Sequence, residues 1–237
     1  MDALADLARL EGVGSAFASA RDGIDALLRD RGLRRTTPEL TGESLFLGAC
    51  ASAALDGSTS TADELRAGSG DAAGSAALRL STELLGLAPV LQRTPLQAFA
   101  RLHTLAAKGE VDDDQLGRPR DPQAAGRLGD LSRLLLAPSE APALVAAAVV
   151  HAELATVAPF ASHNGLVARA AERLVLVARG VDPTSLTVPE AGHLALAGQY
   201  PVRLEGYGEG TRGGVHAWLL HAADAFTAGA QASPLRG

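Results

Sequence analysis

Cysteine, lysine and aromatic residues are scarce in this 237-residue chain. Cys50 is the only cysteine, so an internal disulfide and a thiolate metal cluster are excluded. Aromatic residues make up only 3% of the sequence, and the core must therefore come mainly from leucine, valine and alanine. Alanine is the best helix former, and small side chains let helices approach closely. The composition predicts an all-α helical bundle.

A basic excess is also missing. The formal net charge is -6, whereas nucleic-acid-binding proteins usually carry a basic stripe or patch. We therefore expect no nucleic-acid partner. Lys108 is the only lysine, and nearly all positive charge is arginine. Arginine, alanine, glycine and proline have GC-rich codons, so we expect a bacterial protein from a GC-rich genome.

Long hydrophobic runs are absent as well. The longest, over residues 141–150, is too short to span a bilayer. The first twelve residues lack the basic start and apolar run of a signal peptide. We expect no membrane partner and a cytoplasmic location.

Apolar residues instead recur at helical spacing along most of the chain, with a break at residues 34–38. We predict an N-terminal helical extension over residues 1–40, one helical domain over 41–228 and a flexible tail over 229–237. The polar segment 109–122 is expected to form an exposed loop or a short hairpin. The sequence leaves the oligomeric state open. Helices are predicted near residues 43–55, 72–85, 95–107, 124–136, 139–157, 165–179, 189–199 and 214–227.

The most informative stretch runs from His151 to Arg169. An apolar helix ends before a proline, and a short polar loop leads straight into a second helix. The first N–H groups of that helix lack intrahelical partners and, with the helix dipole, favour an anion. We expect Asn164 to be the N-cap, Gly165 to allow close approach, and Arg169 to lean back toward the ligand. With Ser162, these residues form a predicted phosphate cradle; a plain helix–turn–helix is the alternative.

The same stretch resembles the core motif of the Fic (Fido) family, His-Pro-Phe-x-Asp/Glu-Gly-Asn-Gly-Arg-x-x-Arg. The matching residues are Pro159, Phe160, Asn164, Gly165 and Arg169. Leu102-His103 and Gly117-Arg-Pro-Arg120 resemble two family features that precede the motif, and the resemblance extends over roughly residues 40–227. It implies a Fic-like helical bundle, with a short hairpin flap before the motif as an option.

A second resemblance lies upstream. Ser52-Ala-Ala-Leu-Asp56-Gly57 is similar to the family's inhibitory helix, which ends Ser-x-x-x-Glu-Gly. The resemblance implies that Asp56 pairs with Arg169, as the inhibitory glutamate pairs with the last motif arginine. Aspartate is one methylene shorter than glutamate, and the alternative is that Asp56 merely ends a helix.

Four departures affect the chemistry that the resemblance implies. Ala158 stands where the family has its histidine base, and Ser162 where it has the acid that holds Mg²⁺. His163 replaces the first glycine, and Leu166 replaces a phosphate-binding arginine. A general base needs a titratable side chain, and Mg²⁺ prefers carboxylate oxygens. We therefore expect ordinary AMP transfer to be lost and Mg²⁺ to be a doubtful cofactor.

Three functions stay open. The first is an adenylyltransferase-like pseudoenzyme that binds ATP, another nucleotide or a protein partner. The second is an active nucleotidyl or phosphoryl transferase of non-standard chemistry, with His163 as the acid–base residue. The third is an interaction domain whose site is locked by Asp56 and Arg169. No metal site is expected, because His151 is interpreted as a buried core histidine and the other histidines show no ligand spacing.

Overall fold

The computed structural model describes residues 2–29 and 37–236. Most of the predicted break at 34–38 lies outside these residues. Within them the chain contains helices and no strand, so the all-α prediction is confirmed and segment 109–121 is a loop rather than a hairpin. The helices are α1 (Ala3–Ala8), α2 (Val13–Leu27), α4 (Pro38–Leu55), α5 (Ala62–Arg66), α6 (Ala72–Glu83), α7 (Ala88–Arg93), α8 (Pro95–Ala107), α9 (Pro122–Leu136), α10 (Ala143–Val157), α11 (Asn164–Ala178), α12 (Pro189–Ala195), α13 (Tyr200–Gly208) and α14 (Arg212–Gln231), with 3₁₀ turns at Leu84–Leu87 and Pro234–Arg236.

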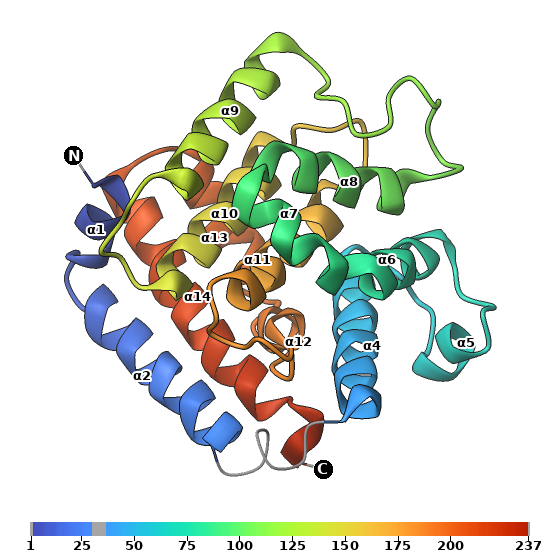
Figure 1. The fold of residues 1–237 in the computed structure, drawn as a ribbon, viewed down its shortest axis with the longest axis horizontal. Coiled ribbons are helices and arrows are strands. Elements are labelled where there is room, and N and C mark those ends of the chain that lie inside the picture. Colours follow the sequence, from blue (N-terminus) through green and yellow to red (C-terminus); the bar gives the residue numbers. More distant parts are fainter. Residues whose placement is uncertain (1, 30–36, 237) are drawn as a thin grey trace.

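Helices α10 and α11 pack against each other at the centre of the molecule (Figure 1). Residues 144–152 of α10 are all buried, because the helix is apolar around its whole circumference. Helix α11 is buried without a break over residues 166–176, although it carries two arginines and a glutamate there. The central helices therefore bring charged side chains into the core, where each one requires a partner.

The surrounding helices supply those partners. Helices α4, α7 and α8 contact α11 directly, and α12 lies between α4 and α14 (Figure 1). The N-terminal α2 runs beside α14, where the rings of Phe17 and Phe226 lie 6.2 Å apart. Phe17 and Ile24 belong to the main hydrophobic core, so the segment predicted as an extension packs into the body of the protein.

Several predicted details match the structure. Helix α8 has the predicted bounds, and α9 ends at the predicted residue, Leu136. Others differ. The helix predicted over 189–199 ends at Ala195, and α13 starts at Tyr200, with Pro201 in the first turn, where its missing N–H is not needed. Helix α14 extends beyond residue 228, and Leu235 is buried, so residues 229–236 pack against the body rather than forming a free tail.

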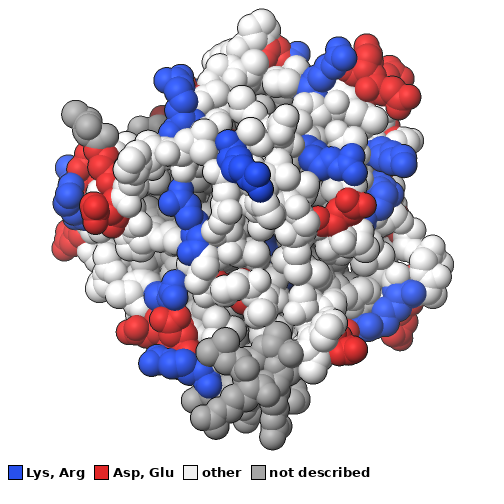
Figure 2. Space-filling model, viewed as in Figure 1, with Lys and Arg blue, Asp and Glu red and all other residues white. Residues whose placement is uncertain are grey.

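The surface gives two further observations. No helix in the described part of the chain is both long and apolar enough to cross a membrane. On the face shown in Figure 2, acidic and basic side chains are interspersed over the described residues. The expected absence of a nucleic-acid partner stays a prediction.

Helix α12 lies very close to α14, and Gly192 is the reason. A Cβ atom at this position would lie 1.9 Å from the backbone oxygen of Ala225. We predict that Gly192→Ala lowers the free energy of unfolding by at least about 2 kcal/mol, because backbone cannot yield as a flexible side chain can. Gly23→Ala is the matched control: a Cβ there meets nothing within 4 Å, and helix propensity should add about 1 kcal/mol. Urea denaturation measures both, and equal effects would contradict the close approach.

Candidate functional site

The loop between α10 and α11 turns sharply at each end, and the side chain of Asn164 bonds across it. Ala158 and His163 both have left-handed backbone angles, with φ of 45° and 53°. The side-chain oxygen of Asn164 accepts from Phe160 N–H at 2.9 Å, and its amide donates to Phe160 O at 3.0 Å. The prediction that Asn164 is the N-cap is therefore wrong: His163 holds that position, and Asn164 is the first helical residue, whose amide is used to close the loop.

The segments that resemble the family come together around this loop. The rings of His103 and Phe160 stack, with centroids 4.5 Å apart. His103 Nδ1 accepts from Gly117 N–H at 2.9 Å, and Arg120 N–H donates to Pro159 O at 2.8 Å. Three stretches separated in the sequence thus form one wall of the site. Burial lowers the pKa of His103 to about 4, so its imidazole is neutral at pH 7.

Arg169 lies at the centre of the predicted phosphate cradle and is 2% exposed. Its Nε donates to Ser52 Oγ at 2.8 Å, and one terminal nitrogen donates to the Tyr200 hydroxyl at 3.1 Å. The other terminal nitrogen donates to Ser52 O at 3.0 Å and to Asp56 Oδ1. Burial alone would lower the pKa of Arg169, but Tyr200 and Asp56 together raise it, so the side chain stays cationic.

The Asp56–Arg169 pair implied by the resemblance is present. Asp56 is also the C-cap of α4, and Gly57 follows it with a φ of 85°. The residue therefore both pairs with Arg169 and ends a helix, so both of the predicted alternatives are present. A Cβ atom on Gly165 would lie 2.6 Å from Asp56 Oδ1. The Asp56 carboxylate thus lies beside the first turn of α11, near the helix end whose free N–H groups and dipole favour an anion.

Three of the four residues in this loop and helix that depart from the Fic motif are Ala158, Ser162 and Leu166. Ala158 has no titratable group, and Leu166 is 1% exposed within the core. The hydroxyl of Ser162 is buried and makes no hydrogen bond. Mg²⁺ prefers several carboxylate or phosphate oxygens, and a single hydroxyl at this point does not fit it.

His163 lies at the edge of the site with its side chain 14% exposed. Its Nε2 lies 2.9 Å from Glu110 Oε2, in the loop that follows α8. Glu110 also accepts from Arg79 at 3.1 Å. The Glu110 carboxylate therefore orients the His163 imidazole through Nε2, and Nδ1 is the nitrogen that does not face this carboxylate.

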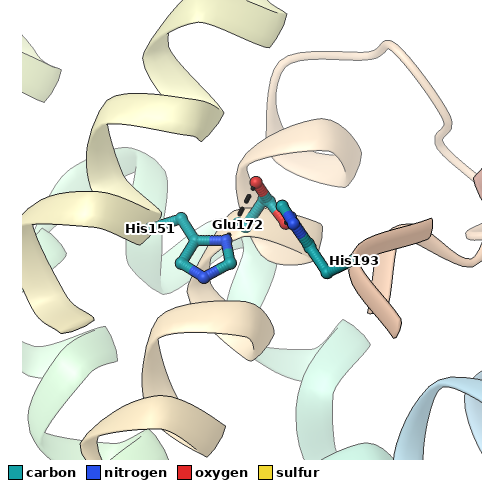
Figure 3. Close-up of side chains that lie close together, drawn as sticks. All are labelled: His151, Glu172 and His193. Atoms are coloured by element: carbon teal, nitrogen blue, oxygen red, sulfur yellow. Dashed lines mark hydrogen bonds and ion pairs between the residues drawn. The ribbon is translucent and has the colours of Figure 1, made fainter. Parts of the chain in front are cut away.

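Behind Arg169 lies a buried polar cluster that sequence reasoning missed. Glu172 on α11 lies between His151 on α10 and His193 on α12, and all three side chains are fully buried (Figure 3). His151 Nε2 lies 2.7 Å from the Tyr200 hydroxyl, so the expected buried, hydrogen-bonded histidine is confirmed. Burial would raise the pKa of Glu172, but the two histidines outweigh it and lower the pKa to about 2.

A second buried ion pair lies one residue further along α11. Arg173 donates to both carboxylate oxygens of Glu190, at 2.9 Å from Nε to Oε1 and 2.6 Å from Nη2 to Oε2. The sequence did contain a signal for these residues. Glu172 and Arg173 on α11, with Glu190 and His193 on α12, interrupt helices that are otherwise apolar on their buried faces.

Comparison with known proteins identifies the fold. No protein-family model matches the sequence, and no curated protein matches it. A Fic family protein from Desulfovibrio desulfuricans is similar in structure, with a TM-score of 0.76, 16% identity, and coverage of 94% of this chain and 74% of that one. A fragment of Fic-1 from C. elegans gives a TM-score of 0.68 at 18% identity, covering 93% of this chain and 71% of its own. A glutamate-to-glycine variant of that fragment gives 0.70 at 19%, covering 92% and 70%. The chain has the Fic fold, as the resemblance implied.

The buried His103 makes the site sensitive to acid. Its pKa is about 4 in the folded protein, whereas the ordinary value of 6.5 applies in the unfolded chain, so the unfolded chain binds one more proton between these pH values. Stability is therefore lost as the pH falls from about 6.5 to 4, by about 1.4 kcal/mol per pH unit. We predict a shallower slope for His103→Asn, whose oxygen can still accept from Gly117. Urea titrations between about pH 4 and 7 measure how the free energy of unfolding of each protein depends on pH. The difference between the two proteins at neutral pH reports the loss of the stacking of His103 on Phe160. Equal slopes for wild type and His103→Asn would contradict the prediction.

Proposed function

We propose that this Fic-fold protein is an adenylyltransferase-like pseudoenzyme that binds a nucleotide or another phosphate ligand at the start of α11. The observation that carries the proposal is the position of the Asp56 carboxylate, against Gly165 and Arg169. An anionic group already lies against a buried guanidinium and beside the first turn of α11. A phosphate can take the same place when Asp56 withdraws.

The residues that would hold the phosphate are Gly165, through close backbone approach, and Arg169, through its guanidinium. Arginine binds phosphate in the same fork geometry with which it binds a carboxylate. Ser52 and Tyr200 would keep Arg169 in place, because they bond it independently of Asp56. Release of Asp56 therefore frees one donor of Arg169 without leaving the side chain unsupported.

The proposal includes the loss of ordinary AMP transfer. Ala158 cannot take a proton from a target hydroxyl, and Ser162 offers no carboxylate to a metal. Leu166 is packed in the core and cannot neutralise phosphate charge. The protein would act through binding, with ATP or another nucleotide as ligand in the cytoplasm, and a protein partner would respond to the ligand-bound form.

A second candidate function is supported by His163. A histidine whose one ring nitrogen faces a carboxylate can act as a general base with the other, and Glu110 has this relation to His163. This candidate is a transferase of non-standard chemistry, in which His163 Nδ1 takes the proton from an acceptor hydroxyl.

We predict that removal of the Asp56 carboxylate strengthens nucleotide binding. Asp56→Ala should melt lower than wild type without ligand, because Arg169 loses a buried partner. ATP, ADP or AMP should stabilise Asp56→Ala more than wild type. At a ligand concentration one hundred times Kd, the free energy of unfolding of the variant should rise by about 2.7 kcal/mol, which corresponds to a few degrees in melting temperature. Thermal melts and calorimetric titration measure this, with Asp113→Asn in the exposed loop as the charge-matched control. An absence of any nucleotide effect in both Asp56→Ala and wild type would refute nucleotide binding at this site and leave a protein-interaction domain as the function.

The second candidate makes a different prediction. Incubation with nucleotide labelled in the transferable group and with cell extract should leave covalent label on a protein, and His163→Ala should remove it. Glu110→Gln should reduce the label in part, since it loses the orienting charge. The pseudoenzyme proposal, in contrast, predicts no covalent label with wild type, His163→Ala or Glu110→Gln. Label that depends on His163 would establish the transferase and refute the pseudoenzyme.

A further inference from the structure

We propose that His151, Glu172 and His193 form a closed site for a divalent transition metal, for which Zn²⁺ is the best match. Their ligand atoms lie within 4.8 Å of one another, on three different helices. His151 Nδ1 lies 3.1 Å from Glu172 Oε1, and His193 Nε2 lies 2.9 Å from Glu172 Oε2 (Figure 3). The two carboxylate oxygens thus each face one imidazole nitrogen, and three residues from three helices can each offer a ligand atom to the same point.

The charge of the buried carboxylate favours a cation at that point. Among the described residues, Arg169 pairs with Asp56 and Arg173 with Glu190, while Glu172 contacts only histidines. Buried charges are normally paired with an opposite charge or bound to a metal. Glu172 therefore has no arginine or lysine as its counter-ion, although two arginines lie on the same helix.

Two of the donor atoms also lack hydrogen bonds. His151 Nδ1 and Glu172 Oε1 are completely buried and, despite their 3.1 Å separation, are aligned too poorly to bond each other. Buried polar atoms in native proteins nearly always have a partner. A metal ion between them would satisfy both, because it needs a lone pair from each and no shared proton.

The outer nitrogens of both histidines have the partners that metal-binding histidines require. A histidine that binds metal through one ring nitrogen usually bonds a protein group through the other, which fixes the ring. His151 Nε2 lies 2.7 Å from the Tyr200 hydroxyl oxygen, to which its N–H can donate. His193 Nδ1 lies 3.4 Å from His221 Nε2, and the His193 ring stacks on Trp218.

The chemistry of the donors decides the ion. Two imidazole nitrogens and a carboxylate oxygen suit Zn²⁺, which binds this combination of nitrogen and oxygen ligands in proteins. Complete burial separates the three side chains from bulk water and substrate, which favours a structural role over a catalytic one. The ion would join α10, α11 and α12 directly behind Arg169, and this inference does not depend on the proposed ligand of α11.

The test is metal retention by the full chain. Because the site is enclosed, the protein is unfolded and then refolded with excess ZnCl₂ or CoCl₂, desalted and analysed for bound metal. We expect about one ion per chain in the wild type and a higher melting temperature than after refolding with a chelator. Glu172→Gln and His193→Gln should each retain at least about tenfold less metal. His216→Gln, outside the cluster, is the matched control and should retain as much as wild type.

A second readout needs no variant. Trp218 is the only tryptophan, and its ring centroid lies 5.0 Å from that of His151 and 5.7 Å from that of His193. Bound Co²⁺ should therefore quench tryptophan emission strongly and show the visible absorption of a tetrahedral ion, whereas Zn²⁺ should do neither. Failure of the refolded wild type to retain metal would overturn the inference. So would full retention by folded Glu172→Gln, or unquenched Trp218 emission in the Co²⁺ protein.

Discussion

The structure depends on the burial of charged side chains along one helix, and above all on Arg169. A guanidinium that is removed from water must keep its donors bonded, since a buried unpaired charge costs several kcal/mol. Ser52 and Asp56 bring the end of α4 to it, and Tyr200 brings the start of α13. Three helices that are distant in the sequence are thereby fixed at the site. The same bonds that hold these helices together also occupy the donors of Arg169, so the stability of the fold and the geometry of the candidate site depend on one set of contacts.

Helix α11 repeats this arrangement along its length. Glu172 faces two histidines and Arg173 faces Glu190, again from helices other than its own. An apolar helix could slide or rotate against its neighbours at little cost, whereas each of these pairs is satisfied in one register only. The close approach of α12 and α14 at Gly192 adds a steric constraint of the same kind. Charge and shape together fix the position of α12, and with it Glu190 and His193.

The candidate site combines the terminus of α11 and a buried arginine with neighbouring positions that carry no charged group. The loop between α10 and α11 and Arg169 lie at positions that match the Fic motif. Ala158, Ser162 and Leu166 are not residues that move protons, hold Mg²⁺ or neutralise phosphate. These features are the basis on which we propose binding without transfer, and the Asp56 carboxylate now pairs with Arg169 beside Gly165. The polar cluster behind it is buried away from the surface and is linked to Arg169 through the Tyr200 hydroxyl, which both His151 and Arg169 contact.

The sequence by itself determined the helical architecture, most helix bounds and the ordered motif around Phe160, because these follow from local periodicity, capping and turn residues. It also supplied Asp56 and Arg169 as candidates, through resemblance, without fixing whether the shorter aspartate could reach. Only the tertiary structure decided that the two meet and that His163 rather than Asn164 caps α11. It also decided that Glu172 lies between two histidines, which are separated from it by 21 residues in each direction. Such contacts depend on how helices pack, and packing is set by the fit of whole surfaces and not by the spacing of residues along one chain segment.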